Sequence, residues 1–175
     1  MRAVSTPLVL VPLLITPGLL LHYDVTPKAI VLLAGSAAAL ALYRPFRLLD
    51  LLLGAQAISL VVSTLASADP ALSLVGSNWR RFGLVTQLAL LVWTYAASRQ
   101  SSLTLLRAIA ASGGLVAIYG IAQYFGWDPF LPRDSYHVGE GVWTIVRPPG
   151  TLGHAGYFAV YLLHVAFAGV AVAGA

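Results

Sequence analysis

Long apolar runs, separated by short polar joints, divide this chain from end to end. A helix needs about 20 mostly apolar residues to cross the hydrocarbon core of a membrane. Six runs approach that length, and we predict that each forms a transmembrane helix. The runs cover residues 7–21, 27–43, 48–66, 82–97, 103–125 and 155–175.

The first two runs contain residues that typically mark helix boundaries. Pro12 and Pro17 interrupt the first run, which superficially resembles a signal peptide. A cleavable signal normally ends in a small-residue cleavage site before a hydrophilic mature chain, whereas here a second apolar run follows almost at once. We therefore predict a transmembrane helix, with a signal anchor as the alternative. Thr26 followed by Pro27 is typical of an N-cap and a first helical residue.

Two connections, residues 67–81 and 126–154, are much longer than the others. With six spans, both fall on the same side of the membrane. The sequence thus predicts one all-α, polytopic transmembrane bundle over residues 1–175, with 126–154 as an external loop.

The longer of these connections has its own pattern. Pro129 and Pro132 prevent the preceding helix from resuming. Two β-prone runs, 136–138 and 142–146, then flank a Gly-Glu-Gly turn at 139–141. This pattern predicts a small hairpin on the membrane surface. An irregular surface loop is the alternative.

The composition agrees with a membrane protein. Hydrophobic residues make up 59% of the chain and charged residues only 9%, whereas soluble domains carry roughly 25% charged residues. A soluble fold of this size has too much surface to hide so many apolar side chains. The absence of cysteine excludes disulfides, thiolate nucleophiles and cysteine-based metal sites.

The ten Lys and Arg residues are scattered singly or in pairs. No basic run is dense enough to indicate a nucleic-acid partner. Counting positive residues gives five on each side of the predicted bundle, so the positive-inside rule alone does not orient it. However, one side has its arginines in tight joints, and the other carries five of the six carboxylates. We therefore predict a cytoplasmic N-terminus, with both long connections outside.

A first polar cluster, residues 76–83, precedes the fourth run and contains Arg80 and Arg81. In the simpler interpretation, both arginines reach the interface, where Trp79 and Phe82 anchor the segment. In the functional interpretation, an arginine faces the bundle and binds a phosphate, which suits its planar, bidentate guanidinium.

A second polar cluster, residues 147–158, precedes the last run. Thr151 is expected to cap a helix that begins there, and Arg147 lies just before it. Free N–H groups at such a helix start attract anions, although an ordinary interfacial helix start is an equal alternative. His154 is a candidate proton carrier, phosphate donor or packing residue. A lone histidine does not make a metal site, and His164, inside the last run, is expected to bond a neighbouring helix.

Three stretches, in this order, resemble the superfamily of bacterial O-antigen ligases and O-antigen polymerases. Residues 76–84 (GSNWRRFGL) are similar to its glycine-serine and arginine-pair segment. Residues 119–129 (YGIAQYFGWDP) are similar to its YGxxQYFGxDP helix exit, and residues 147–162 to its R…GTxGNxNxFAxYL segment. His154 and Gly156 stand where the family commonly has asparagine.

The resemblance implies a metal-independent, cofactor-free membrane glycosyltransferase of cell-envelope polysaccharide or lipopolysaccharide biosynthesis. Such an enzyme moves a glycan from undecaprenyl pyrophosphate to a lipid, glycan or protein acceptor, on the external face of the bacterial inner membrane. Arg80 and Arg147 match the family's arginines and are expected to hold the pyrophosphate, followed by Arg81 and His154. No catalytic residue is assigned.

Family members have about twice as many spans, and a later external loop supplies the residues thought to activate the acceptor. We therefore expect residues 1–175 to be the N-terminal half of a larger enzyme, inactive alone. Two alternatives from other classes remain. One is a small transporter or transporter subunit, because broken helix starts with converging charge also mark transporter sites. The other is a non-catalytic structural membrane subunit.

Overall fold

The computed structural model of the chain describes all residues except 1, 19–21, 42–44, 46, 78–79 and 141–142. Within this described part, seven α-helices, two short 3-10 helices and one two-stranded sheet form, and helix accounts for 71% of the described residues. The prediction of a mostly helical protein is therefore confirmed.

Six of the seven helices correspond to the six apolar runs. α3, α6 and α7 are long and apolar enough to cross a membrane. α1 has 12 residues, and α2 and α5 have 15 each. At 1.5 Å per residue, 15 residues span about 22 Å, less than the roughly 30 Å of a hydrocarbon core. The six-span count thus stays a prediction. The bounds are α1 Arg2–Leu13, α2 Thr26–Leu40, α3 Arg47–Leu65, α5 Leu84–Ser98, α6 Ser102–Tyr124 and α7 Ala155–Ala173.

The first helix differs most from its predicted range of 7–21. It starts at Arg2 and ends at Leu13. The helix does not continue to residue 21 because Pro17 lacks an N–H and disfavours helical geometry in the residue before it. α2 begins at Thr26 itself, with Val25 as an N-cap that makes no side-chain bond. The prediction of Thr26 as the cap was therefore wrong, whereas Pro27 does lie in the first turn. The predicted ends at residues 21 and 43 lie outside the described residues.

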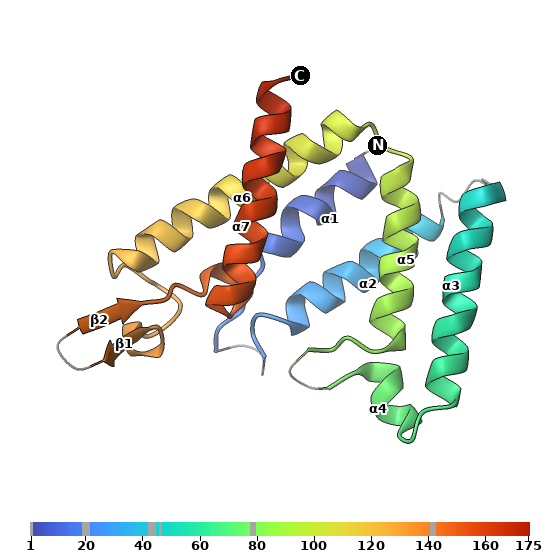
Figure 1. The fold of residues 1–175 in the computed structure, drawn as a ribbon, viewed down its shortest axis with the longest axis horizontal. Coiled ribbons are helices and arrows are strands. Elements are labelled where there is room, and N and C mark those ends of the chain that lie inside the picture. Colours follow the sequence, from blue (N-terminus) through green and yellow to red (C-terminus); the bar gives the residue numbers. More distant parts are fainter. Residues whose placement is uncertain (1, 19–21, 42–44, 46, 78–79, 141–142) are drawn as a thin grey trace.

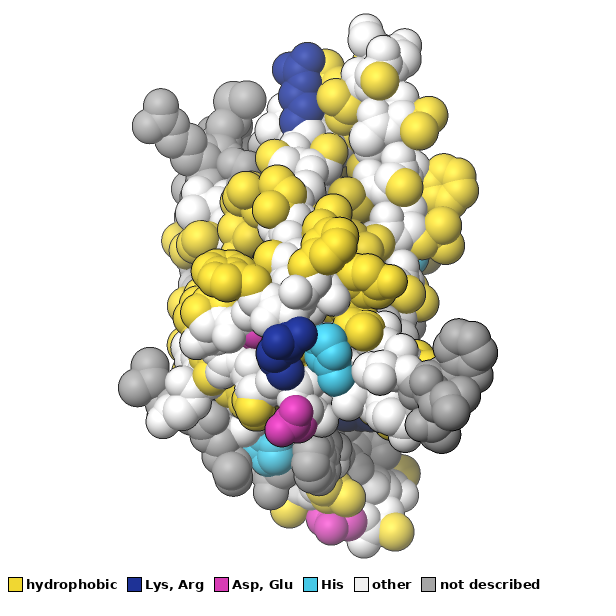
Figure 2. All heavy atoms as spheres, turned by 90° about the vertical axis from the view of Figure 1, so that its left-hand side faces the viewer, with side chains coloured by type: hydrophobic (Ala, Val, Ile, Leu, Met, Phe, Trp, Pro, Cys, Tyr) yellow, Lys and Arg dark blue, Asp and Glu magenta, His cyan; other side chains and the backbone are white. Residues whose placement is uncertain are grey.

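The helices pack in the order α7, α6, α1, α2, α5 and α3. In Figure 1, α7 crosses α6 on the left, and α3 lies at the right edge. α3 packs mainly on α5 and buries none of its apolar window. Its side chains are therefore free to contact lipid. In Figure 2, hydrophobic side chains cover the middle of one face, and most charged side chains lie toward its upper and lower ends.

α6 and α7 approach each other closely because small residues lie between them. A Cβ added at Gly113 would lie 2.1 Å from the Val165 side chain, and one at Gly120 would lie 2.4 Å from the Phe158 ring. The hydroxyls of Ser112 and Tyr161 lie 3.2 Å apart across the same interface. Such small-residue contacts are typical of helix packing in membranes.

The long connections contain further short elements. The first holds α4 (Pro70–Val75), which was not predicted. The second holds β1 (His137–Glu140) and β2 (Trp143–Val146), which pair antiparallel, after the 3-10 helix η1 (Arg133–Ser135). The predicted hairpin is confirmed, but its 139–141 turn was wrong, because residues 139 and 140 belong to β1. α4, the hairpin and the start of α7 lie toward the same end of the helices (Figure 1).

Candidate functional site

The two polar clusters predicted from the sequence meet at one cavity of about 900 Å³, which we call the polar cavity. Three segments far apart in the sequence form it: residues 22–25, 80–82 and 152–157. Arg80 from the first cluster and His154 from the second both line it. The full lining is His22, Tyr23, Asp24, Val25, Arg80, Phe82, Leu152, Gly153, His154 and Tyr157.

Arg147 lies in an adjoining hollow of about 230 Å³, which we call the side cavity. The two cavities share Tyr23, Gly153 and His154 as lining residues. Arg80 and Arg147 are both exposed, so their guanidinium groups are accessible to a ligand. The structure therefore brings three of the four predicted residues to two adjoining hollows.

Arg81 differs from the other three residues. It lines neither cavity, its φ is +49°, and it is only partly exposed. Its Nε is buried and has no hydrogen-bond partner among the described residues. A left-handed conformation is uncommon for a residue with a side chain, and here it follows from the tight turn, in which the Arg81 N–H donates to the Ser77 carbonyl at 2.8 Å.

Two glycines close the loop that carries Arg80. Gly76 has a φ of +82°. A Cβ added at Gly83 would lie 2.4 Å from the Gly76 nitrogen, so the two backbones touch at the neck of the loop. The Arg80 N–H also donates to the Ser77 carbonyl, at 3.1 Å. Trp79, predicted as an interfacial anchor, lies outside the described residues.

His154, and not Thr151, caps the helix of the second cluster. α7 begins at Ala155, and the Gly156 N–H donates to Nδ1 of His154 at 3.1 Å. The prediction for Thr151 was wrong because Gly153, with a φ of +74°, separates the 3-10 helix η2 (Gly150–Leu152) from α7. Since Nδ1 accepts a hydrogen bond, the neutral ring carries its hydrogen on Nε2. His154 thus offers an exposed N–H donor at the helix start.

A buried glutamine, to which the sequence analysis assigned no role, holds this segment in place. Gln123 is 0% exposed. Its Nε2 donates to Asp128 Oδ2 at 2.7 Å, and its Oε1 accepts from the Gly150 N–H at 2.9 Å. The Tyr119 hydroxyl donates to Asp128 Oδ1 at 2.7 Å. Gln123 thereby connects the end of α6 to the backbone just before His154.

Asp128 is the acceptor at the centre of this network. Burial raises the pKa of its carboxyl, but hydrogen bonds from the Phe130 N–H, Tyr119, Gln123 and the Leu131 N–H outweigh burial and lower the pKa below its ordinary value. The charged form is therefore the one that the fold stabilises.

Lys28, one of the ten scattered Lys and Arg residues, connects Asp24 in the lining of the polar cavity to Thr151, the residue before Leu152 in that lining. Its Nζ donates to the carbonyls of Asp24, at 2.6 Å, and Thr151, at 2.5 Å. The Asp24 carboxylate packs directly on Gly153, where an added Cβ would lie 2.1 Å from Oδ2. Burial and the negative charges of Asp24 and Asp128 raise the pKa of Tyr23, so its phenol remains a hydrogen-bond donor.

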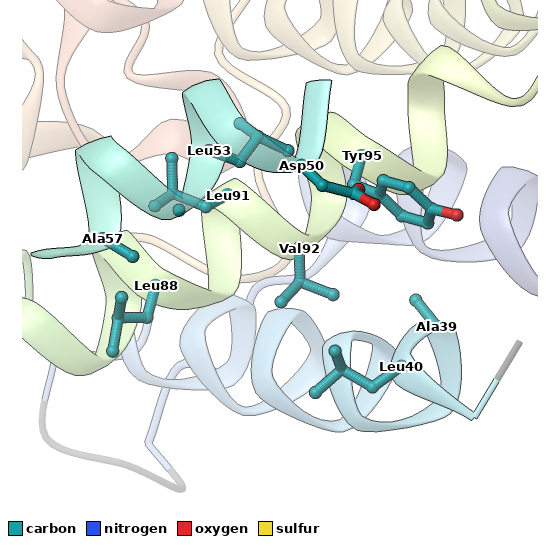
Figure 3. Close-up of a pocket in the computed structure, with 10 residues that line it drawn as sticks. Ala39, Leu40, Asp50, Leu53, Ala57, Leu88, Leu91, Val92 and Tyr95 are labelled. Atoms are coloured by element: carbon teal, nitrogen blue, oxygen red, sulfur yellow. The ribbon is translucent and has the colours of Figure 1, made fainter. Parts of the chain in front are cut away.

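Other predicted candidates lie elsewhere. His164 is exposed, and its Nδ1 lies 2.7 Å from the Val160 carbonyl of its own helix, so the predicted bond to a neighbouring helix was wrong. A hollow of about 280 Å³ between α2, α3 and α5 is mainly apolar, with Asp50 and Tyr95 beside each other at one end (Figure 3). None of the four predicted site residues lines it.

The polar cavity can therefore offer an anion a guanidinium, an imidazole N–H and phenol hydroxyls. The one carboxylate in its lining, that of Asp24, repels an anion. Among the described residues, no group of three or more His, Asp or Glu side chains is placed to hold a metal ion. Comparison of the chain with protein-family models, curated proteins and solved structures gives no match.

Proposed function

We propose that this chain belongs to a membrane glycosyltransferase and binds the pyrophosphate of a polyprenyl-linked glycan. One observation supports this proposal most. Arg80 and His154, which come from segments far apart in the sequence, line one cavity of about 900 Å³, and Arg147 lines the hollow beside it. The resemblance to O-antigen ligases and polymerases implies that the same arginines hold the carrier.

The proposed reaction requires stabilisation of a leaving group. An acceptor hydroxyl forms a bond to the anomeric carbon of the glycan while the bond from that carbon to the pyrophosphate oxygen breaks. The electron pair leaves with the polyprenyl pyrophosphate, and the hydroxyl proton passes to a base. Arg80 and Arg147 neutralise the charge that develops on the pyrophosphate, which is the kind of electrostatic effect that usually contributes most to catalysis. We assign the role of the base to none of the four predicted residues.

The proposed topology has six spans, a cytoplasmic N-terminus and the polar cavity on the external face of a bacterial inner membrane. Its support is the common end at which α4, the hairpin and the start of α7 lie. The acceptor, which is a lipid, a glycan or a protein, then reaches the cavity from outside. A pyrophosphate lipid in the outer leaflet places its head group at this level.

A transfer assay on the full gene product, with undecaprenyl-pyrophosphate-linked glycan as donor, tests the proposal. Charge-assisted hydrogen bonds contribute about 1.5–3 kcal/mol each, so an Arg80→Ala, Arg147→Ala double variant should lose roughly two orders of magnitude of activity or more. Arg107→Ala is the matched control, because Arg107 is an exposed arginine of α6 that lines neither cavity. Normal transfer by the double variant would exclude the assigned role of the arginines.

A further inference from the structure

Three polar side chains follow one side of α3, although this helix is otherwise mainly apolar. Gln56, Ser59 and Ser63 are all exposed. At 3.6 residues per turn, their spacings of three and four residues place them in one stripe along the helix, which we call the polar stripe. Leu53 and Ala57, which line the hollow in Figure 3, lie on a different side of α3, toward α5. The polar stripe therefore faces outward.

The position of Gln56 makes its exposure costly in a membrane. α3 has 19 residues, and Gln56 is the middle one. Each end of the helix is then about 14 Å away, at 1.5 Å per residue, so an α3 that crosses the membrane holds this amide near the centre of the hydrocarbon core. Within the part of the chain that the structure describes, the Gln56 amide and the hydroxyls of Ser59 and Ser63 have no hydrogen-bond partner.

Lipid satisfies most of the α3 surface but not the polar stripe. Leu51, Ile58 and Leu65 are exposed, and acyl chains solvate such side chains well. An acyl chain, in contrast, has neither a donor nor an acceptor for a primary amide or a hydroxyl. Polar side chains in this position are typically satisfied by hydrogen bonds to another membrane helix. The polar stripe therefore indicates a helix, and not lipid, as its partner.

A second copy of α3 has the chemistry that the polar stripe requires. A glutamine amide carries both donors and an acceptor, so two Gln56 side chains related by a two-fold axis can satisfy each other. Serine hydroxyls are likewise donor and acceptor, and their small size lets two backbones come close. The stripe carries no charge, so two copies meet without repulsion. α3 also lies at the edge of the helix row (Figure 1), and its apolar window is 0% buried.

We propose that two copies of this chain associate through the polar stripes of their α3 helices, with Gln56 of one copy bonded to Gln56 of the other. This inference does not depend on the proposed function, because no residue of the stripe lines the polar cavity or the side cavity. Hydrogen bonds between membrane helices are individually modest. The dimer is therefore expected to form in proportion to the density of the protein in the membrane.

Förster transfer between labelled copies of the full gene product, in liposomes over a range of protein-to-lipid ratios, tests this inference. We expect a saturable dimer signal for the wild type. Gln56→Leu removes the paired amide bonds and should weaken dimerisation roughly tenfold. Ser59→Phe should weaken it at least as much, because the ring holds the two backbones apart. Ile58→Phe is the matched control, since Ile58 is an exposed neighbour outside the stripe, and it should leave the dimer unchanged.

Disulfide formation identifies the partner, because the chain has no cysteine of its own. On oxidation in the membrane, Ser59→Cys should give a covalent dimer of the chain at least several-fold faster than Ile58→Cys. A monomer at every protein density would overturn the inference. A dimer that Gln56→Leu and Ser59→Phe leave unchanged, or a disulfide that forms equally fast at both positions, would do the same. Attachment of the Ser59→Cys thiol to a different protein would exclude a second copy as the occupant.

Discussion

Replacing Gln123 with leucine should destabilise the fold and weaken the site together. The side chain is fully buried, donates a hydrogen bond to Asp128 and accepts one from the Gly150 N–H. Leucine has a similar volume but leaves the buried Gly150 N–H unpaired, at a cost of about 1–3 kcal/mol, and removes a charge-assisted bond worth about 1.5–3 kcal/mol. Because water partly compensates Asp128, we expect a total loss of about 3 kcal/mol in the free energy of unfolding.

Denaturation in detergent micelles, followed by near-ultraviolet circular dichroism, measures this loss. Gln87→Leu is the matched control, since among the described residues the Gln87 side chain makes only one long bond, of 3.4 Å, to the Phe82 carbonyl. That variant should stay within about 0.5 kcal/mol of the wild type. Gln123→Leu should also weaken the binding of polyprenyl pyrophosphate several-fold, because Gly150 precedes His154 on a short segment. Equal stability of the two leucine variants would refute the role assigned to Gln123.

Two further predictions concern Gly153 and Asp128. Gly153→Ala should reduce carrier binding and stability, because the φ of Gly153 is +74° and the Asp24 carboxylate fills the space of a Cβ. Gly169→Ala in α7 should leave both unchanged, because a Cβ added there meets nothing within 4 Å. Equal effects of the two variants on thermal stability would contradict this reasoning. The pKa of Asp128 is lowered in the folded state, so the unfolded chain binds more protons in the acid range. The stabilisation is therefore present above the unfolded pKa of about 3.9, and it is lost as the pH falls through the folded pKa. Asp128→Asn should therefore lower stability at neutral pH and flatten its loss in an acid titration, whereas an unchanged acid slope would argue against the network.

The apolar runs predicted the long helices well. α6 and α7 follow their predicted ranges closely, because each apolar run is bounded by polar or glycine residues at which the helix starts or ends. α4 was missed because its six residues carry no such signal. However, Asp69 before Pro70 is a cap pattern, and Asp69 does accept from the Leu72 N–H at 2.9 Å. A search for caps within the long connections would have found it.

The site was predictable only where residue types carry the signal. Arg80 and His154 stood out as polar residues at helix starts, and the structure brings both to one cavity. Lys28 and Gln123 did not stand out, because their long-range partners are the backbone carbonyl of Thr151 and the backbone N–H of Gly150. A backbone partner leaves no trace in residue identity, so only the folded chain reveals which segments these side chains join.

Cysteine labelling of right-side-out membrane vesicles tests the central claim most directly, because the chain has no cysteine of its own. Tyr157→Cys places a thiol in the lining of the polar cavity, and Leu72→Cys places one on α4, outside it. The native side chains are 57% and 54% exposed, which makes the pair a fair comparison.

We predict that a membrane-impermeant maleimide labels both variants from outside, and that undecaprenyl pyrophosphate slows labelling only at position 157. Labelling at position 157 that is equally fast with and without the carrier would contradict the proposed site.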